Sequence, residues 1–249
     1  MNFNILRFDR LDSTNLEALR QARKGAEEGT VVVATQQTAG RGRQGRGWIS
    51  PKDSGLYLTI VLRPKLDTAH LTLISIAASI AVHDTLAGIG VEPDIKWPND
   101  ILVGEKKICG ILAETTDTSN GLVVVVGIGI NLTSGDFSPE LADSATSIED
   151  ELPASFSPIE LESLLLQQFK DFYEQLCRPT GPAEIVEEWS RRSTYANGKS
   201  VNVTFSSEAI MGITDGLEPN GALRVRANDG DVKLIHAGDI ERLRPSQQN

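Results

Sequence analysis

The chain has 249 residues, of which 40% are hydrophobic and 23% are charged, and its formal net charge at pH 7 is −10. These values are typical of a folded globular protein with one large domain, or one large and one small, and they exclude a fibrous or disordered chain. No apolar run is long enough to span a bilayer, there is no signal-peptide pattern, and Cys109 and Cys177 lack metal-ligand spacing. We therefore expect a cytoplasmic protein with free thiols.

Hydrophobic patterning in the first 195 residues predicts strands that alternate with helices. Strands are expected within residues 3–9, 30–37, 54–64, 94–97, 100–103, 106–116 and 121–132. Helices are expected within residues 13–25, 68–90, 157–176 and 182–193. In the first helix, Thr14 is the expected N-cap, Glu17 completes a capping box, and Gly25 ends the helix.

After about residue 195 the pattern changes to short alternating strands that are punctuated by Gly, Asn and Asp. This pattern is typical of a small antiparallel β-barrel of roughly 50 residues, close to the lower limit for an independent core. We therefore expect two domains, residues 1–195 and residues 196–249.

Positive charge is concentrated around one glycine-rich loop, "GRGRQGRGW" at residues 40–48. From Gln36 to Lys65 there are six basic residues and one acidic residue, whereas Asp136 to Glu162 holds eight acidic residues and no basic one. Glycines let a backbone approach a ligand closely, and arginines bind carboxylate and phosphate oxygens in bidentate fashion. The spacing is not that of a Walker A loop. The loop occurs once, between two predicted strands, which favours a small anionic ligand over an RNA-binding arginine–glycine tail.

Two further stretches predict a ligand site. "KWPNDILVGEKKICGIL" joins a Trp-Pro-Asn-Asp turn to a strand that begins with Lys106 and Lys107. Because adjacent strand residues face opposite ways, one of these lysines can point into a pocket, but alternation does not choose which, and both are also typical of edge-strand charges. "GIGIN" ends an apolar strand. There Gly127 and Gly129 either leave room for a ligand or mark bulges, and Asn131 offers a donor and an acceptor.

Together, "STN", "QQTAGRGRQGRGW", "KWPNDILVGEKKICGIL", "GIGIN" and the terminal "AGDIERLR" resemble the biotin–protein ligases in order and spacing, from Leu11 to Arg244. The resemblance implies an α+β fold: a mixed β-sheet with packed helices, of the class II aminoacyl-tRNA-synthetase-like type, plus a C-terminal SH3-like β-barrel. It also implies a two-step reaction. Biotin and ATP, with Mg²⁺, form biotinyl-5′-AMP and release pyrophosphate; a lysine of a biotin carboxyl carrier protein then takes the biotinyl group.

The resemblance also implies roles for individual residues. Lys107 matches the catalytic lysine of the family, and Arg43 and Asp100 would carry the chemistry with it. The implied biotin-binding residues are Ser13, Thr14, Asn15, Gln37, Gly40, Arg41, Gly42, Arg43, Trp48, Lys107 and Gly110. The implied nucleotide-binding residues are Arg41, Arg43, Arg46, Asn99, Lys107, Gly127, Gly129 and Asn131. No protein ligands to a metal are expected. Thr14 has a second interpretation, as a helix cap. Trp48 has a second interpretation, as a core residue.

About ten residues precede "STN", too few for the DNA-binding helix pair that some members of the family carry. The resemblance is therefore to the short form, and we expect no nucleic-acid or membrane partner; a homodimer through the main sheet is a family-level expectation.

One alternative is a lipoate- or octanoyl-protein ligase, which shares the fold and the acyl-adenylate chemistry, although the arginine-rich loop favours biotin. Another is a non-enzymatic RNA-binding module with an SH3-like barrel, which the net charge of −10 disfavours.

Overall fold

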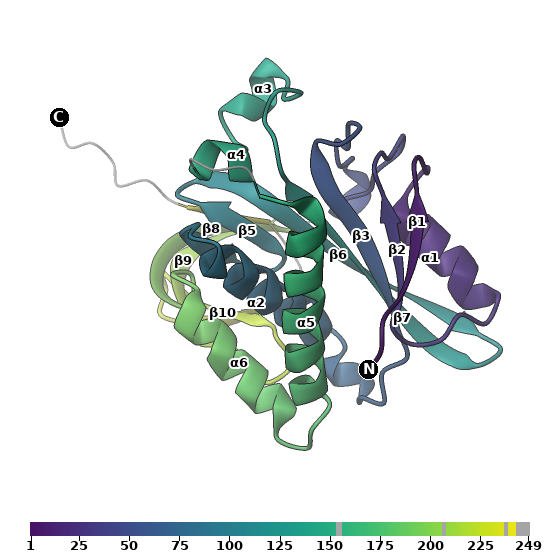
Figure 1. Ribbon diagram of the computed structural model, residues 1–249. Coiled ribbons are helices and arrows are strands. Elements are labelled where there is room, and N and C mark those ends of the chain that lie inside the picture. Colours follow the sequence, from purple (N-terminus) through teal and green to yellow (C-terminus); the bar gives the residue numbers. More distant parts are fainter. Residues whose placement is uncertain (153–155, 206–207, 237–238, 243–249) are drawn as a thin grey trace.

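The computed structural model describes residues 1–152, 156–205, 208–236 and 239–242. The N-terminal part is built on a seven-stranded sheet with the strand order β1-β2-β3-β7-β6-β5-β4 (Figure 1). The strands are β1 (Asn4–Phe8), β2 (Thr30–Ala34), β3 (Gly55–Leu62), β4 (Pro93–Lys96), β5 (Asp100–Val103), β6 (Lys106–Thr118) and β7 (Gly121–Asn131). β1 and β2 are parallel, and all the other neighbouring pairs are antiparallel. The predicted mixed sheet is confirmed.

Four long helices cover the two faces of this sheet. They are α1 (Thr14–Arg23), α2 (Leu73–Gly88), α5 (Pro158–Leu176) and α6 (Gly181–Arg192). α2 packs on one face and is itself covered by α5 and α6, whereas α1 packs on the opposite face (Figure 1). Two short helices, α3 (Pro139–Ala142) and α4 (Ile148–Glu151), and two single turns, η1 (Arg43–Gly45) and η2 (Thr68–His70), lie in the connections.

The segment Thr68–Gly88, which contains α2, is long and apolar enough to cross a membrane by length and composition, with a mean hydropathy of 1.5. In the structure 61% of its most apolar window is buried. From Leu73 to Val82, α2 is apolar around most of its circumference because it lies between the sheet and the two outer helices. By length and composition this segment contradicts the expectation that no apolar run could span a bilayer, but its burial identifies it as the core helix of the domain.

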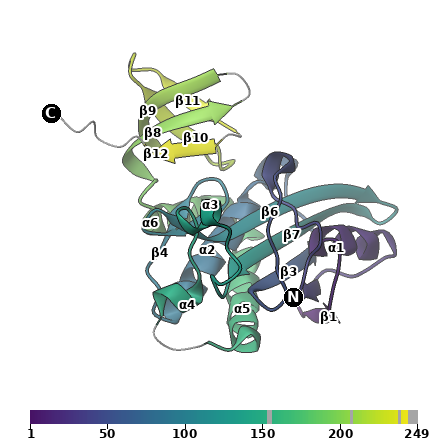
Figure 2. The same cartoon turned by 90° about the horizontal axis from the view of Figure 1, so that it is seen from above.

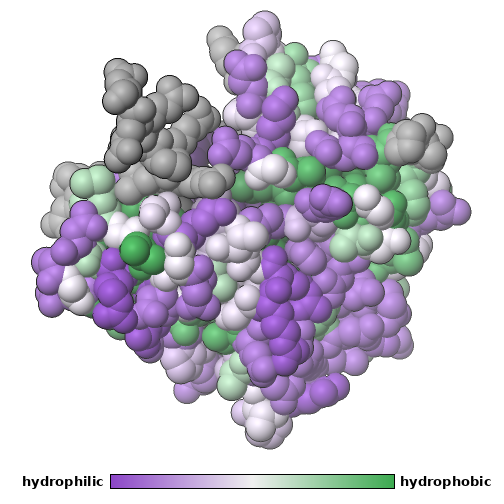
Figure 3. Space-filling model, turned by 90° about the vertical axis from the view of Figure 1, so that its left-hand side faces the viewer, coloured by the Kyte–Doolittle hydropathy of each residue, from purple (hydrophilic) through white to green (hydrophobic). Residues whose placement is uncertain are grey.

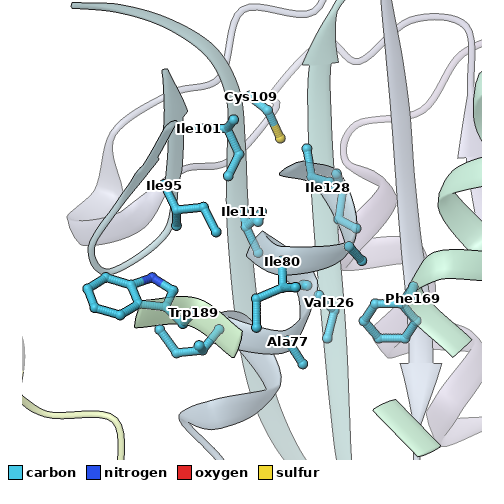
Figure 4. Close-up of a cluster of buried hydrophobic side chains, with 14 of the residues drawn as sticks. Ala77, Ile80, Ile95, Ile101, Cys109, Ile111, Val126, Ile128, Phe169 and Trp189 are labelled. Atoms are coloured by element: carbon cyan, nitrogen blue, oxygen red, sulfur yellow. The ribbon is translucent and has the colours of Figure 1, made fainter. Parts of the chain in front are cut away.

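Side-chain alternation along β7 separates the core from the opposite face. Because successive side chains of a strand point to opposite faces, the even-numbered residues join the main core on the α2 side. These residues are Val124, Val126, Ile128 and Ile130. Figure 4 shows Val126 and Ile128 in the same cluster as Ile80 of α2 and Phe169 of α5. On the other face, Val123 and Val125 pack against α1, and beyond them the strand continues with glycines.

Five strands after α6 form a separate antiparallel sheet at one end of the molecule (Figure 2). They are β8 (Asn197–Phe205), β9 (Glu208–Leu217), β10 (Leu223–Ala227), β11 (Val232–Ile235) and β12 (Asp239–Arg242), in the spatial order β11-β10-β9-β8-β12. The expected C-terminal β domain is confirmed, and its boundary at residue 195 stays a prediction. Within "AGDIERLR", residues 237–238 and 243–244 lie outside the described residues.

The C-terminal sheet contacts the larger domain through the turn before β10. Trp97 Nε1 donates a hydrogen bond to the carbonyl oxygen of Gly221 at 3.0 Å, and the Thr72 hydroxyl donates to the carbonyl oxygen of Asn220. The turn between β4 and β5 is therefore tied to the second domain. The side of the molecule drawn in Figure 3 is mainly hydrophilic, with a band of hydrophobic residues across its upper part and smaller hydrophobic groups elsewhere, as expected for the surface of a folded protein.

Candidate active site

A cavity of about 440 Å³ lies over the glycine-rich end of β7, on the face of the sheet that carries α1. This volume is in the range of small-molecule sites. Nearly all of the site residues implied by the sequence line it: Ser13, Thr14, Asn15, Gln37, Arg41, Gly42, Arg43, Arg46, Trp48, Asn99, Asp100, Lys107, Gly110, Gly127, Gly129 and Asn131. Gly40 does not line it. A Cβ at Gly40 would lie 2.3 Å from the carbonyl oxygen of Trp48, so this glycine allows the loop to fold back on itself.

Glycines form the floor because other side chains lie directly above them. A Cβ at Gly127 would lie 2.0 Å from Asn15 Oδ1, and one at Gly129 would lie 2.5 Å from Trp48 Nε1. A Cβ at Gly110 would lie 3.0 Å from the Trp48 ring. All three distances are shorter than ordinary van der Waals contact, so any larger residue here would displace Asn15 or Trp48.

At one end of the cavity, a buried hydrogen-bond network joins α1 to the loop and the sheet. The Thr14 amide donates to Gln37 Oε1 at 2.8 Å, and the Thr14 hydroxyl donates to the same oxygen at 3.1 Å. Thr59 on β3 is fully buried; its hydroxyl lies 2.9 Å from Thr14 Oγ1 and 2.7 Å from Asn15 Oδ1. Sequence reasoning missed Thr59, although a threonine within the apolar run "LYLTIVL" is a usable signal.

The capping box predicted for the first helix is wrong. The helix begins at Thr14, so Ser13 is the N-cap residue, and Ser13 makes no capping hydrogen bond with its side chain. The Thr14 amide is instead satisfied by Gln37 from another segment. Tertiary contacts thus replace the local cap that the spacing to Glu17 predicts.

The same end of the cavity is supported by Glu114 on β6, which sequence reasoning also missed. Its carboxylate forms an ion pair with Arg41 at 3.0 Å and accepts a hydrogen bond from Asn15 Nδ2 at 2.9 Å. One side chain therefore holds both the arginine loop and the first turn of α1. An acidic residue directly after the run "ICGILA" on the same strand is the signal that could have identified it.

Near the middle of the cavity, Lys107 Nζ lies 2.6 Å from Asp100 Oδ1 and 5.3 Å from the centre of a Trp48 ring. Lys106, by contrast, points away and donates to the carbonyl oxygen of Ala142 at 2.9 Å. The pairing between β5 and β6 shifts by one residue between Lys107 and Cys109. Strict alternation from Gly110 would favour Lys106, and the shift places Lys107 in the cavity instead.

Asn99 connects the arginine loop to the sheet. Arg43 Nη1 donates to Asn99 Oδ1 at 3.2 Å, while Asn99 Nδ2 donates to the carbonyl oxygen of Ile111 at 2.7 Å.

Trp48 forms a wall of the cavity, and its indole N–H is buried without a hydrogen-bond partner among the described residues. The indole N–H lies over Gly129, and the place of Trp48 in the cavity wall favours the pocket interpretation of this residue over the core one.

The other end of the cavity is lined by the segment before α4. Leu141, Ser144 and Ala145 line the cavity here. The Lys107 amide donates to the carbonyl oxygen of Ser144 at 2.9 Å. Tyr57 also lines this end, where burial raises the pKa of its phenol and the nearby Asp136 raises it further. The phenol is therefore neutral at physiological pH.

The sequence matches two family models. Residues 7–131 match the biotin/lipoate A/B protein ligase family, and residues 197–243 match the biotin protein ligase C-terminal domain. The first match covers half of the chain. The chain belongs to the biotin/lipoate A/B protein ligase family. Its second match places it with the biotin protein ligases, which are enzymes.

Related proteins agree with this placement. A biotin–[acetyl-CoA-carboxylase] ligase of Paracoccus denitrificans is 35% identical over 239 residues, which cover 93% of this chain and 97% of that protein. The bifunctional ligase/repressor BirA of Bacillus subtilis is 32% identical over 256 residues, which cover 97% of this chain and 74% of that protein. The structure of a biotin protein ligase from Aquifex aeolicus in complex with biotin and ATP has a TM-score of 0.83 and 27% identity, and the match covers 96% of this chain and 99% of that one.

Among the residues that the structure describes, no group of three or more His, Cys, Asp and Glu side chains is arranged to hold a metal ion. In the cavity, Asp100 is already paired with Lys107 at 2.6 Å. Mg²⁺ is commonly bound through one or two carboxylates together with substrate phosphates. Asp100 and Asn99 fit such a shared role, in which the ion arrives with the nucleotide.

Proposed function

We propose that this chain activates biotin with ATP and transfers it to a lysine of a carrier protein. In the first step an oxygen of the biotin carboxylate attacks the α-phosphorus of MgATP. The bond to the bridging oxygen of the β-phosphate breaks, and pyrophosphate leaves with the electron pair. The products are biotinyl-5′-AMP, a mixed anhydride, and pyrophosphate.

The observation that carries this proposal is that three cationic side chains, each held by a neighbouring side chain, line one cavity. A carboxylate and a triphosphate repel each other, so the reaction needs fixed positive charge where they meet. Lys107, Arg41 and Arg43 all line the cavity. Lys107 is held by Asp100, and Arg43 is held by Asn99. Their orientation before the ligands arrive reduces the reorganisation that the transition state requires.

The polar end of the cavity fits the head group of biotin. Thr14, Asn15 and Gln37 present hydroxyl and amide groups beside the glycine floor. A ureido ring has a carbonyl acceptor and two N–H donors, so it needs a site of this mixed kind. Trp48 supplies apolar surface for the aliphatic chain between the head group and Lys107.

The arginine loop is suited to cover the activated acid. It is tied to the sheet by the Arg41–Glu114 ion pair and by the Arg43–Asn99 hydrogen bond. Excluding water protects a mixed anhydride from hydrolysis. In the second step a lysine amine of a biotin carboxyl carrier protein attacks the anhydride carbonyl and AMP leaves. Pairing of two copies of the chain through the main sheet stays a prediction.

Pyrophosphate exchange tests this proposal. Labelled pyrophosphate is incubated with the protein, MgATP and either biotin, lipoate or octanoate, and label in ATP is measured. Exchange with biotin alone is the expected result, because exchange requires a reversible acyl-adenylate. Exchange with lipoate or octanoate alone would assign the chain to the other branch of the family. The carrier step is then tested with a recombinant carrier domain of acetyl-CoA carboxylase as acceptor.

A further inference from the structure

A row of paired residues crosses five strands on the cavity face of the sheet. In spatial order the residues are Tyr57, Gly129, Gly110, Asp100 and Lys96. All five line the cavity. Residues directly opposite each other on antiparallel strands have their side chains on the same face. Lys96, at the β4 edge of the row, therefore faces the same cavity as Asp100.

Lys96 differs from the other cations in this region. Arg41 pairs with Glu114 at 3.0 Å, and Lys107 pairs with Asp100 at 2.6 Å. Lys96 is half-buried, and its ammonium forms no hydrogen bond or ion pair with any residue that the structure describes. An anion can therefore bind this ammonium without first breaking a protein ion pair.

The strand order indicates where the leaving pyrophosphate lies in the cavity. The proposed function places the head group of biotin at Thr14 and Asn15, beside β3 and β7, and the α-phosphate at Lys107 on β6. At phosphorus, the attacking and leaving oxygens lie roughly in line. The leaving pyrophosphate therefore projects past Lys107 toward β5 and β4, the next strands in the sheet. β4 is two strands from β6, about 10 Å at the usual strand spacing, a gap that a diphosphate and a lysine side chain can bridge.

We propose that Lys96 binds the β- and γ-phosphates of ATP and stabilises pyrophosphate as it leaves. This inference rests on the proposed function. When the bond between the α-phosphorus and the bridging oxygen breaks, negative charge increases on the β-phosphate, and the Lys96 ammonium offsets that charge. In the reverse direction, the same ammonium holds pyrophosphate for attack on the adenylate.

The test compares Lys96→Met and Lys96→Arg with a matched control, Lys65→Met, which removes an exposed lysine that does not line the cavity. Pyrophosphate exchange is measured at varied pyrophosphate, and biotin affinity is measured separately. For Lys96→Met we expect the KM for pyrophosphate to rise roughly 10- to 100-fold, because one charge-assisted hydrogen bond is lost. The KM for ATP is expected to rise as well, and biotin affinity to stay unchanged. Lys96→Arg keeps the charge and is expected to keep most of the exchange activity.

The second half-reaction separates this role from a structural one. Transfer of biotin from supplied biotinyl-5′-AMP to a recombinant carrier domain involves no pyrophosphate, so Lys96→Met is expected to transfer at the wild-type rate. An unchanged KM for pyrophosphate, or an equal loss in both half-reactions, would overturn the inference. Absence of biotin-dependent exchange in the wild-type protein would instead overturn the proposed function, and the inference with it.

Discussion

Lys107 and Asp100 lie 2.6 Å apart across neighbouring strands, at the point where the glycine floor meets the arginine loop. The carboxylate holds the ammonium over Gly110, whose missing side chain leaves space for it; a Cβ there would lie 3.1 Å from Lys107 Cε. A flexible lysine is thereby fixed in one orientation before any substrate binds. Fixed charge of this kind stabilises a transition state more than a ground state.

Lys107→Ala is expected to lower the rate of adenylation about 100-fold or more, with a much smaller change in biotin affinity. The reason is that the ammonium acts on charge that develops during the reaction. Single-turnover formation of biotinyl-5′-AMP measures the rate, and calorimetry measures binding. Lys106→Ala is the control, because Lys106 points away from the cavity. If Lys106→Ala were the inactive variant, the assignment to Lys107 would be wrong.

Arg43→Gly is expected to release biotinyl-5′-AMP roughly tenfold faster, because the hydrogen bond from Arg43 to Asn99 helps hold the loop over the cavity. Escaped adenylate reacts with lysines of any protein nearby. Biotin incorporated into added serum albumin, which is not a carrier protein, therefore reports the escape. The idea that the loop shields the adenylate fails if this variant retains its adenylate as long as the wild type does.

Gly127→Ala is expected to weaken biotin binding about 10- to 100-fold, because the new methyl group would lie 2.0 Å from Asn15 Oδ1 and force that side chain away. Overpacking also lowers the free energy of unfolding by about 1–3 kcal/mol. Gly88→Ala at the end of α2 is the control, since a Cβ there meets nothing within 4 Å. Equal biotin affinities for the two variants would contradict a role for Asn15 beside the ligand.

Glu114→Gln is expected to weaken biotin binding a few-fold. It removes the ion pair with Arg41 and keeps an oxygen that can accept from Asn15 Nδ2. The pair is partly exposed, so its loss corresponds to about 0.2–1 kcal/mol. Glu114→Ala removes both contacts and is expected to have the larger effect. A double-mutant cycle with Arg41→Ala checks the cause: additive effects would show that the two residues do not act together.

The sequence by itself determined where the strands and helices of the first domain lie, and which residue types the loop at residues 40–48 presents. Apolar runs and periodic patterning located the seven strands and four long helices that the structure describes in the first domain, because burial on one face gives a periodic pattern and burial on both faces gives a continuous apolar run. The arginines and glycines of residues 40–48 indicated a small anionic ligand, since these residue types have few other uses in one exposed loop of an acidic protein.

Tertiary structure alone decided which side chains meet. The choice of Lys107 over Lys106 depends on the register shift between β5 and β6. The places of Thr59, Glu114 and Lys96 in or beside the cavity depend on which strands pair, and in what register. Local patterning is set by neighbours along the chain, whereas register is set by pairing between strands that are distant in sequence. For that reason the orientation of Lys107, which the family resemblance had already singled out, and the side chains that support it are decided by the fold.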